Sequence, residues 1–300
     1  MRMNQNSSHH IKAILQALFV TFLWSTSFVI IKLGLDEIPP LTFAGLRYFV
    51  AFVCLLPFTL TKKRIGEFKQ IEKSDWLKLI WLGILFIMVT QGAQFIGLSL
   101  LPAVTVSLLL NFSSAVVAVM AIFFLKEYPT LLQWGGMVLF IVGALIYFYP
   151  VVITADQSLG LAIMMIGVIA NAGSAVLGRG INREMRLSPF VVTLVSMGIG
   201  SVILLTIGII TQGFLPLTLR NIIFIFWMAG INTAFAFVLW NLTLRTLSAM
   251  ESSIINNTML IQIAILAWVF IDEPITLKEG IGMLIAAAGA VLVQWRKRKS

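Results

Sequence analysis

Polar side chains recur at helical spacing inside segments that are otherwise apolar. Gln91 and Gln94 are three residues apart, and Asn111 and Ser114 are also three apart, so each pair shares one face of a helix. Polar groups are costly in hydrocarbon and usually face a bundle interior or a water-filled cavity. Because amides and hydroxyls both donate and accept hydrogen bonds, we expect these residues to bind a small polar solute.

Ten residues form the predicted substrate-binding set. The indoles of Trp24 and Trp240 can stack on a ligand, although Trp240 also suits the aromatic belt of a membrane interface. The alternative for each polar residue is a hydrogen bond between helices, worth about 0.6 kcal/mol. Polar residues cluster in the first, third, fourth, eighth and ninth apolar segments, which favours a cavity lined by those five. The full set is Trp24, Ser25, Arg47, Gln91, Gln94, Asn111, Ser114, Asn232, Trp240 and Asn257.

Arg47 is the one basic residue in the interior of a predicted span, since the others within the spans lie at most two residues from a span end. It lies eight residues past Pro39, about 12 Å deep at 1.5 Å per residue. One hypothesis is that it attracts an anionic group such as a substrate carboxylate. The other, slightly favoured by the sequence, is a structural role, either snorkelling to the outer interface or binding a helix carbonyl.

Residues able to catalyse a reaction are scarce. Both histidines, His9 and His10, lie in the polar N-terminal tail, and the lone Cys54 cannot form an intrachain disulfide. No spacing of Cys and His suits a metal, and no pair of carboxylates lies inside a span. Glu127 and Glu251 are near helix ends, where an interfacial role is expected. The sequence therefore predicts neither an enzyme nor a cofactor or metal site.

The elements that position the polar residues are predicted to be membrane-spanning helices. Hydrophobic residues make up 59% of the 300-residue chain and charged residues 11%, with a mean hydropathy of +1.00. A soluble protein cannot bury that much apolar surface, and a β-barrel would show alternation instead of continuous apolar runs. We expect an all-α membrane protein with ten spans, near residues 13–33, 39–61, 76–99, 102–125, 130–149, 158–178, 188–211, 219–242, 248–271 and 276–294.

The basic residues predict the orientation of these spans. With both termini in the cytoplasm, 17 Lys and Arg fall on that side and 3 on the other, while Arg47 lies inside a span. This asymmetry follows the positive-inside rule. Membrane insertion therefore explains the net charge of +9, and we expect the lipid bilayer, not nucleic acid, as the partner.

The two halves of the chain resemble each other. Aligning residues 98–146 with 244–292 makes fifteen of 49 positions identical without a gap, including Asn111/Asn257 and Glu127/Glu273. A shift of 147 also pairs Lys32 with Arg179. We therefore expect two five-helix repeats, 1–150 and 151–300. Because five is odd, the second repeat is predicted to be inverted, an arrangement common in secondary transporters.

Several short motifs occur in order along the chain: Leu23-Trp24-Ser25 with Phe28 and Lys32, Pro40 with Arg47, and the repeated endings Phe124-Leu125-Lys126-Glu127 and Phe270-Ile271-Asp272-Glu273. On these motifs the chain resembles the EamA-type carriers of the drug/metabolite transporter superfamily over nearly its whole length. The resemblance implies ten helices in two repeats, with the fifth and tenth helices peripheral. The family often has a proline midway along the fourth and ninth helices; here those stretches read Asn111-Phe112-Ser113-Ser114 and Asn256-Asn257-Thr258-Met259, so a milder bend is expected.

These features predict an alternating-access carrier in the cytoplasmic (inner) membrane of a bacterium. The neutral, amide-rich set suits zwitterions, so we expect export of small metabolites, amino acids or related compounds. A drug efflux transporter is the alternative, because aromatic and Met residues are also present. An organic phosphate or nucleotide-sugar exchanger ranks lower, since more than one cavity cation is expected for it. The substrate, coupling ion and oligomeric state stay open.

Overall fold

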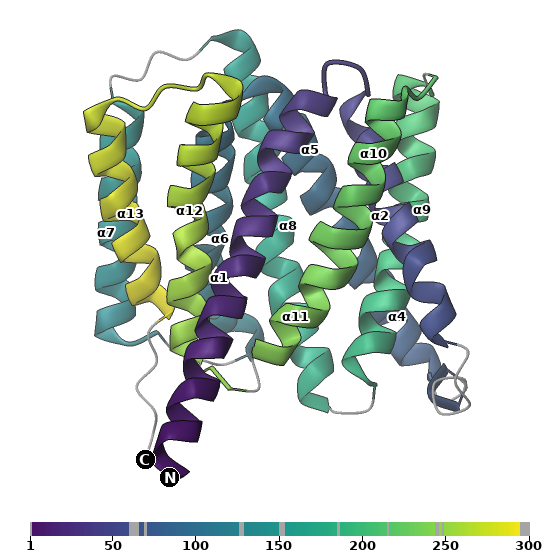
Figure 1. The fold of residues 1–300 in the computed structure, drawn as a ribbon, viewed down its shortest axis with the longest axis horizontal. Coiled ribbons are helices and arrows are strands. Elements are labelled where there is room, and N and C mark those ends of the chain that lie inside the picture. The colour runs from purple at the N-terminus through teal and green to yellow at the C-terminus, as the bar shows by residue number, and fades with distance from the viewer. Residues whose placement is uncertain are drawn as a thin grey trace.

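The computed structural model describes residues 2–59, 66–68, 71–125, 129–149, 154–184, 187–214, 216–243, 246–247 and 249–294. Within these ranges every regular element is a helix. The long helices stand side by side, and the connections gather at two opposite faces (Figure 1). We call the face where α1 begins and α13 ends the near face, and the opposite one the far face.

The helices follow one another along the chain with short connections. Two spans change from α-helix to π-helix and back: one consists of α4, η2 and α5, the other of α10, η3 and α11. The bounds are α1 Arg2–Gly34, α2 Pro40–Leu55, η1 Leu56–Thr59, α4 Lys73–Leu82, η2 Gly83–Gln91, α5 Gly92–Leu100, α6 Ala103–Leu125, α7 Leu131–Phe148, α8 Ala155–Glu184, α9 Pro189–Gln212, α10 Leu219–Trp227, η3 Met228–Phe235, α11 Ala236–Thr243, α12 Ala249–Ile271 and α13 Leu277–Gln294.

Local signals in the sequence set several helix ends. Pro40 and Pro189 begin α2 and α9, where a missing N–H costs nothing. Thr130 caps α7 by accepting from the Gln133 N–H. Gly213 ends α9 with φ of 82°, a conformation that favours glycine.

Seven helices in the described part of the chain are long and apolar enough to cross a membrane. Two further apolar helices, Leu219–Phe235 and Ile255–Ile271, are shorter. The expectation of an all-α membrane protein agrees with this architecture, whereas the count of ten spans stays a prediction. The seven are His10–Gly34, Pro40–Thr59, Lys73–Leu100, Ala103–Phe124, Leu131–Phe148, Ala155–Ile181 and Pro189–Gln212.

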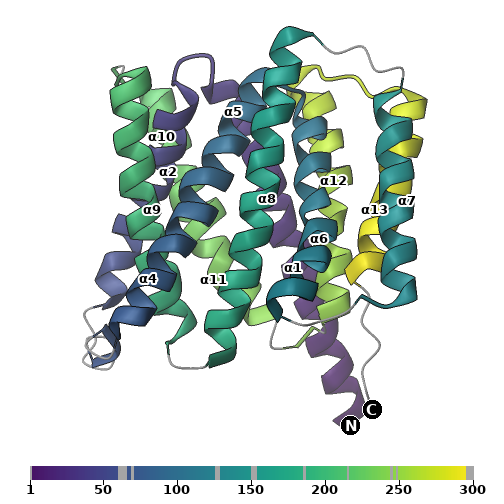
Figure 2. The ribbon, with the colours of Figure 1, turned by 180° about the vertical axis from the view of Figure 1, so that it is seen from behind.

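Glycines on α7 and α13 bring these two helices into backbone contact. A Cβ placed on Gly143 would lie 2.3 Å from the Ala286 nitrogen, and one on Gly289 would lie 2.4 Å from the Phe140 nitrogen. Only glycine permits such an approach. The pair stands at one edge of the molecule (Figures 1 and 2). These glycines therefore serve packing within one chain.

Candidate functional site

A polar cavity of about 400 Å³ lies between the helices. Seven of the ten predicted site residues line it: Trp24, Arg47, Gln91, Gln94, Asn111, Ser114 and Asn232. None of the described lining residues belongs to α7 or α13, as expected for peripheral helices. The remaining lining residues are Ser27, Phe28, Tyr48, Phe86, Thr90, Ser107, Leu110, Ser113, Asn171, Phe237, Asn256, Met259 and Ile263.

The other three predicted residues are not among those that line the cavity. Ser25 is fully buried and donates to the Thr21 carbonyl, or to Gln262 Oε1 at 3.0 Å. Trp240 packs on Trp24 with ring centroids 5.2 Å apart. Asn257 is buried, and its neighbour Asn256 lines the cavity instead. Of the two adjacent asparagines, whose side chains differ in direction by about 100°, spacing selected the one that does not line the cavity.

Arg47 is buried in the cavity wall. It is 5% exposed, its Nε donates to Thr233 Oγ1 and its Nη2 to Ser27 Oγ, both at 3.4 Å. The guanidinium also lies 5.2 Å from the centroid of the Tyr48 ring. No described carboxylate pairs with it. A buried guanidinium held by two long hydroxyl contacts strongly favours an anion beside it.

Asn232 organises the wall next to Arg47. Its Nδ2 donates to the Leu23 carbonyl and to Ser27 Oγ, both at 2.7 Å, and its backbone carbonyl accepts from Trp24 Nε1 at 3.0 Å. Its Oδ1 has no donor within the described structure. Through Ser27, one network thus joins a cation that has no counter-ion among the described residues to an acceptor that has no donor among them.

Neutral side chains complete the wall. Tyr48 donates to Gln91 Oε1 at 2.7 Å, and Asn171 Nδ2 donates to Ser113 Oγ at 3.1 Å. Asn111 donates back to the carbonyl of Ser107 on its own helix at 2.9 Å. Tyr48 and Asn171 were missed by the sequence analysis, although the rule that polar residues in spans face inward would have found both.

The two π-helical stretches lie at corresponding places in the third and eighth predicted spans. In η2, Thr90 donates to the carbonyl of Leu85, and in η3, Thr233 donates to that of Met228, five residues back in each case. Wider turns of this kind are frequent at functional sites. They bring Gln91 and Asn232 into the cavity wall. These π-helical turns were not predicted from the sequence.

A three-helix clasp lies at the far face. Lys32, near the end of α1, pairs with Glu273 Oε1 at 2.8 Å, and Glu273 Oε2 accepts the N–H of Ala103 at the start of α6 at 2.7 Å. Asp272, with φ of 51°, turns the chain after α12 so that Glu273 points back. We call Lys32, Ala103 and Glu273 the far clasp.

Apolar packing separates the far clasp from the cavity. Buried apolar side chains of α1, α6 and α12 lie between the two: Ile31 and Ala267 are fully buried, and Val104 is 3% exposed. All three belong to one core cluster with Phe43 and Phe95, whose rings meet edge to face. The cavity is therefore sealed toward the far face.

No group of three or more His, Cys, Asp or Glu side chains within the described ranges is placed to hold a metal ion. Among the described residues that line the cavity, Arg47 is the one that carries a charge. The arrangement is that of a binding compartment buried between membrane helices.

Comparison with known proteins agrees with this class of protein, a multi-helix membrane transporter. The model of the EamA-like transporter family matches residues 11–149 and again 158–295. The chain therefore belongs to the EamA-like transporter family, as the sequence motifs indicated. That family model matches once in each half of the chain.

Several relatives are transporters. The chain is 25% identical to the uncharacterized transporter YoaV of Bacillus subtilis (strain 168), over 93% of this chain and 95% of that protein. It is 27% identical to the uncharacterized transporter YvbV of the same strain, over 93% and 90%. An S-adenosylmethionine/S-adenosylhomocysteine transporter of Chlamydia trachomatis serovar L2 is 24% identical, over 84% of this chain and 80% of that protein.

A solved crystal structure shares the fold. It superimposes with a TM-score of 0.68 at 14% identity and covers 94% of this chain and 97% of that chain. The likeness extends to the whole helical arrangement. Because the chain belongs to the EamA-like transporter family, transport across a membrane is its general function, and the cavity is its candidate site.

Proposed function

We propose that this protein exports small zwitterionic metabolites, amino acids or related compounds, by alternating access. The observation that carries the proposal is Arg47, a buried cation in the cavity wall without a carboxylate partner among the described residues. A substrate carboxylate would supply the missing charge. The surrounding amides and hydroxyls would hold the rest of a small polar solute.

The donor and acceptor pattern supports an α-amino acid group as the recognised element. Arg47 offers N–H donors to a carboxylate, and Asn232 Oδ1 is an acceptor to which an ammonium group can donate a hydrogen bond. S-adenosylmethionine, named for one relative, also carries an α-amino carboxylate. The same two residues would then bind the common part of either kind of substrate.

The proposed architecture is ten helices in two inverted repeats, residues 1–150 and 151–300. Applying the repeat shifts to the far clasp pairs Lys32 with Arg179, Ala103 with Ala249 and Glu273 with Glu127. Glu127 lies outside the described residues. The same three chemical groups thus recur in the second set, which is expected at the near face. We propose that the two sets seal opposite faces in turn.

The proposed location is the cytoplasmic membrane of a bacterium, with both termini in the cytoplasm. The 17-to-3 distribution of Lys and Arg supports this orientation. The near face would then be cytoplasmic. With the far clasp closed, the structure would correspond to a state that admits substrate from the cytoplasm.

Drug efflux is the second candidate function. Trp24, Phe86 and Phe237 give the cavity aromatic walls that suit a flat apolar cation or neutral compound. The charge of Arg47 disfavours cations, which make up many such compounds. An exchanger of organic phosphates is less well supported, because one cation lines the described cavity.

Counterflow into liposomes tests the proposal. Purified protein is reconstituted, the vesicles are loaded with a single unlabelled amino acid, and uptake of the same labelled amino acid is compared with its carboxamide. We expect saturable uptake of amino acids, with the carboxamide weaker by about tenfold or more, because it lacks the charge for Arg47. Transport of ethidium without any amino acid uptake would favour the drug efflux candidate and reject the proposal.

A further inference from the structure

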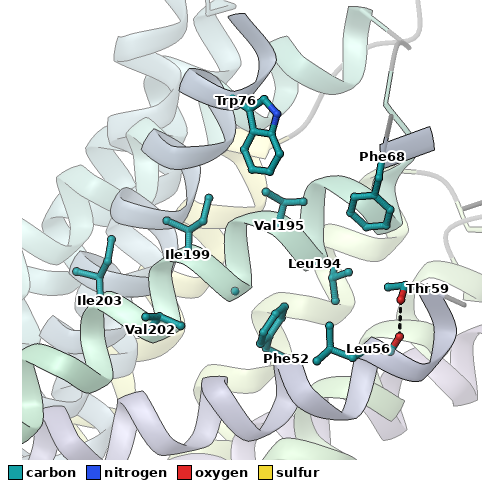
Figure 3. A pocket seen from close by; sticks show the side chains of 11 residues that line it. Phe52, Leu56, Thr59, Phe68, Trp76, Leu194, Val195, Ile199, Val202 and Ile203 are labelled. Carbon is teal, nitrogen blue, oxygen red and sulfur yellow. Dashed lines mark hydrogen bonds between the residues drawn. The ribbon is translucent and has the colours of Figure 1, made fainter. Parts of the chain in front are cut away.

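An apolar groove on the outside of the bundle is separate from the cavity. It encloses about 680 Å³ and shares no described lining residue with the cavity. Apart from the indole N–H of Trp76, its one polar side chain is Thr59, which donates to the Leu56 carbonyl at 2.6 Å, so its hydroxyl is already used (Figure 3). The lining residues are Phe52, Leu56, Thr59, Phe68, Trp76, Leu194, Val195, Gly198, Ile199, Val202 and Ile203.

The groove follows the bilayer normal along α9. Its wall runs from Leu194 to Ile203, a rise of about 14 Å at 1.5 Å per residue. That length matches roughly half of the ~30 Å hydrocarbon core. Gly198 forms its floor, where Phe52 lies so close that a Cβ would come within 2.7 Å of the ring. A single extended hydrocarbon chain from one leaflet fits these dimensions.

The near-face end of the groove is basic. Lys73 begins α4 and lies one turn from Trp76, so both are on the same face of the helix. Lys73 is exposed and pairs with no described residue. Trp76, 42% exposed, has the position of an interfacial anchor.

Acidic residues at this end are engaged within the protein. Glu67 accepts from Ser188 Oγ at 2.5 Å, and Asp75, 4% exposed, accepts the N–H of Glu72 in the cap of α4. The sequence from 60 to 78 holds six Lys and Arg against three Asp and Glu, a net charge of +3. Such a segment attracts anionic headgroups.

We propose that this groove is a specific site for an anionic phospholipid of the near-face leaflet. One acyl chain fills the space between α2, α4 and α9, and the phosphate lies at Lys73 beside the indole of Trp76. Phe52, which lines the groove, is one turn from Tyr48, which lines the cavity, so α2 borders both compartments. The site is independent of the substrate that the cavity transports.

Native mass spectrometry of the detergent-purified protein tests the site. The protein is titrated with phosphatidylglycerol or phosphatidylcholine of the same acyl chains. We expect one retained phosphatidylglycerol per chain and about fivefold weaker retention of phosphatidylcholine, the effect of one interfacial lysine. Ile199→Trp, which fills the groove, should remove the retained lipid, and Lys73→Gln should abolish the preference between the two lipids.

Two control variants separate the site from general lipid contact. Ile141→Trp adds the same indole at an exposed position of α7, and Lys12→Gln removes an exposed charge near the start of α1. Both should bind lipid as the unmodified chain does. Equal retention of the two lipids by the unmodified protein, or no loss in Ile199→Trp, would overturn the proposal. A dimer that disappears in Ile199→Trp would assign the groove to a second copy and would also overturn it.

Discussion

The cavity and the groove are both bounded by α2 and the span that begins with α4, yet they differ in chemistry. The groove is the larger, about 680 Å³ against about 400 Å³. Apart from the indole N–H of Trp76 at its exposed end, it has one polar side chain, and that side chain is already hydrogen-bonded within its own turn. The cavity wall contains a buried cation and a buried acceptor, neither of which has a charge partner or donor among the described residues. Unsatisfied polar groups, and not volume, therefore distinguish the compartment suited to a polar solute.

Replacement of Arg47 by Gln should give the largest change. Carboxylate-bearing substrates should be transported about tenfold to a hundredfold less well, because a charge-assisted hydrogen bond contributes about 1.5–3 kcal/mol. Transport of the carboxamide analogues should decrease little, because they carry no charge for Arg47 to bind. Counterflow at matched protein levels in the liposomes measures both.

Arg220 offers the matched control for Arg47. It is also an arginine, but it is exposed, pairs with Glu37 at 3.6 Å and lies outside the cavity. Arg220→Gln should transport both kinds of solute as before. If Arg47→Gln lowered the transport of carboxylates and of carboxamides equally, the role of Arg47 would be structural. The chemical contrast drawn between the two compartments would then be wrong.

Breaking the far clasp should give the next largest effect. Lys32→Met or Glu273→Gln should increase labelling of a cysteine introduced at Ile31 by a membrane-impermeant reagent from the far face, by about fivefold. A half-buried ion pair stabilises the closed clasp by about 1 kcal/mol, which corresponds to a change of about fivefold in labelling. The exchange Lys32→Glu with Glu273→Lys should restore part of the protection. Unchanged labelling in both single variants would refute the gating role.

Removal of the hydroxyl of Tyr48 should have a smaller effect. Tyr48→Phe deletes the 2.7 Å hydrogen bond to Gln91, a loss of about 0.5–1.5 kcal/mol. Substrate affinity should fall severalfold, and Gln91→Leu should add little to Tyr48→Phe because both changes remove the same bond. Competition assays on the two single variants and the double variant measure this coupling. If the losses of affinity in the two single variants added up in the double variant, Tyr48 and Gln91 would act independently, which would contradict the prediction.

Filling the groove should change substrate affinity least. Ile199→Trp should leave the half-saturating concentration of the transported solute within about twofold of that of the unmodified protein, because Ile199 lines the groove and not the cavity. A shift as large as that of Tyr48→Phe would mean that the two compartments are coupled through α2. The measurement is counterflow over a range of solute concentrations.

The polar positions that could be predicted from sequence share one physical reason. Asn111, Gln91 and Gln94 lie within largely apolar spans, and a polar group in hydrocarbon usually faces the interior. This reason does not distinguish between adjacent polar residues: Asn256 lines the cavity, and Asn257 does not. A single step along a helix turns a side chain by about 100°, so packing decides between adjacent residues.

Composition and charge distribution determined that this chain is a helical membrane protein, since hydrophobicity and the positive-inside rule are properties of segments. Motifs and repeats determined its family. Only the tertiary structure decided that Lys32 and Glu273 meet, that η2 and η3 open into π-turns, and that Ser27 joins Arg47 to Asn232. These contacts connect residues up to 241 positions apart. They depend on how helices pack, which local sequence does not encode.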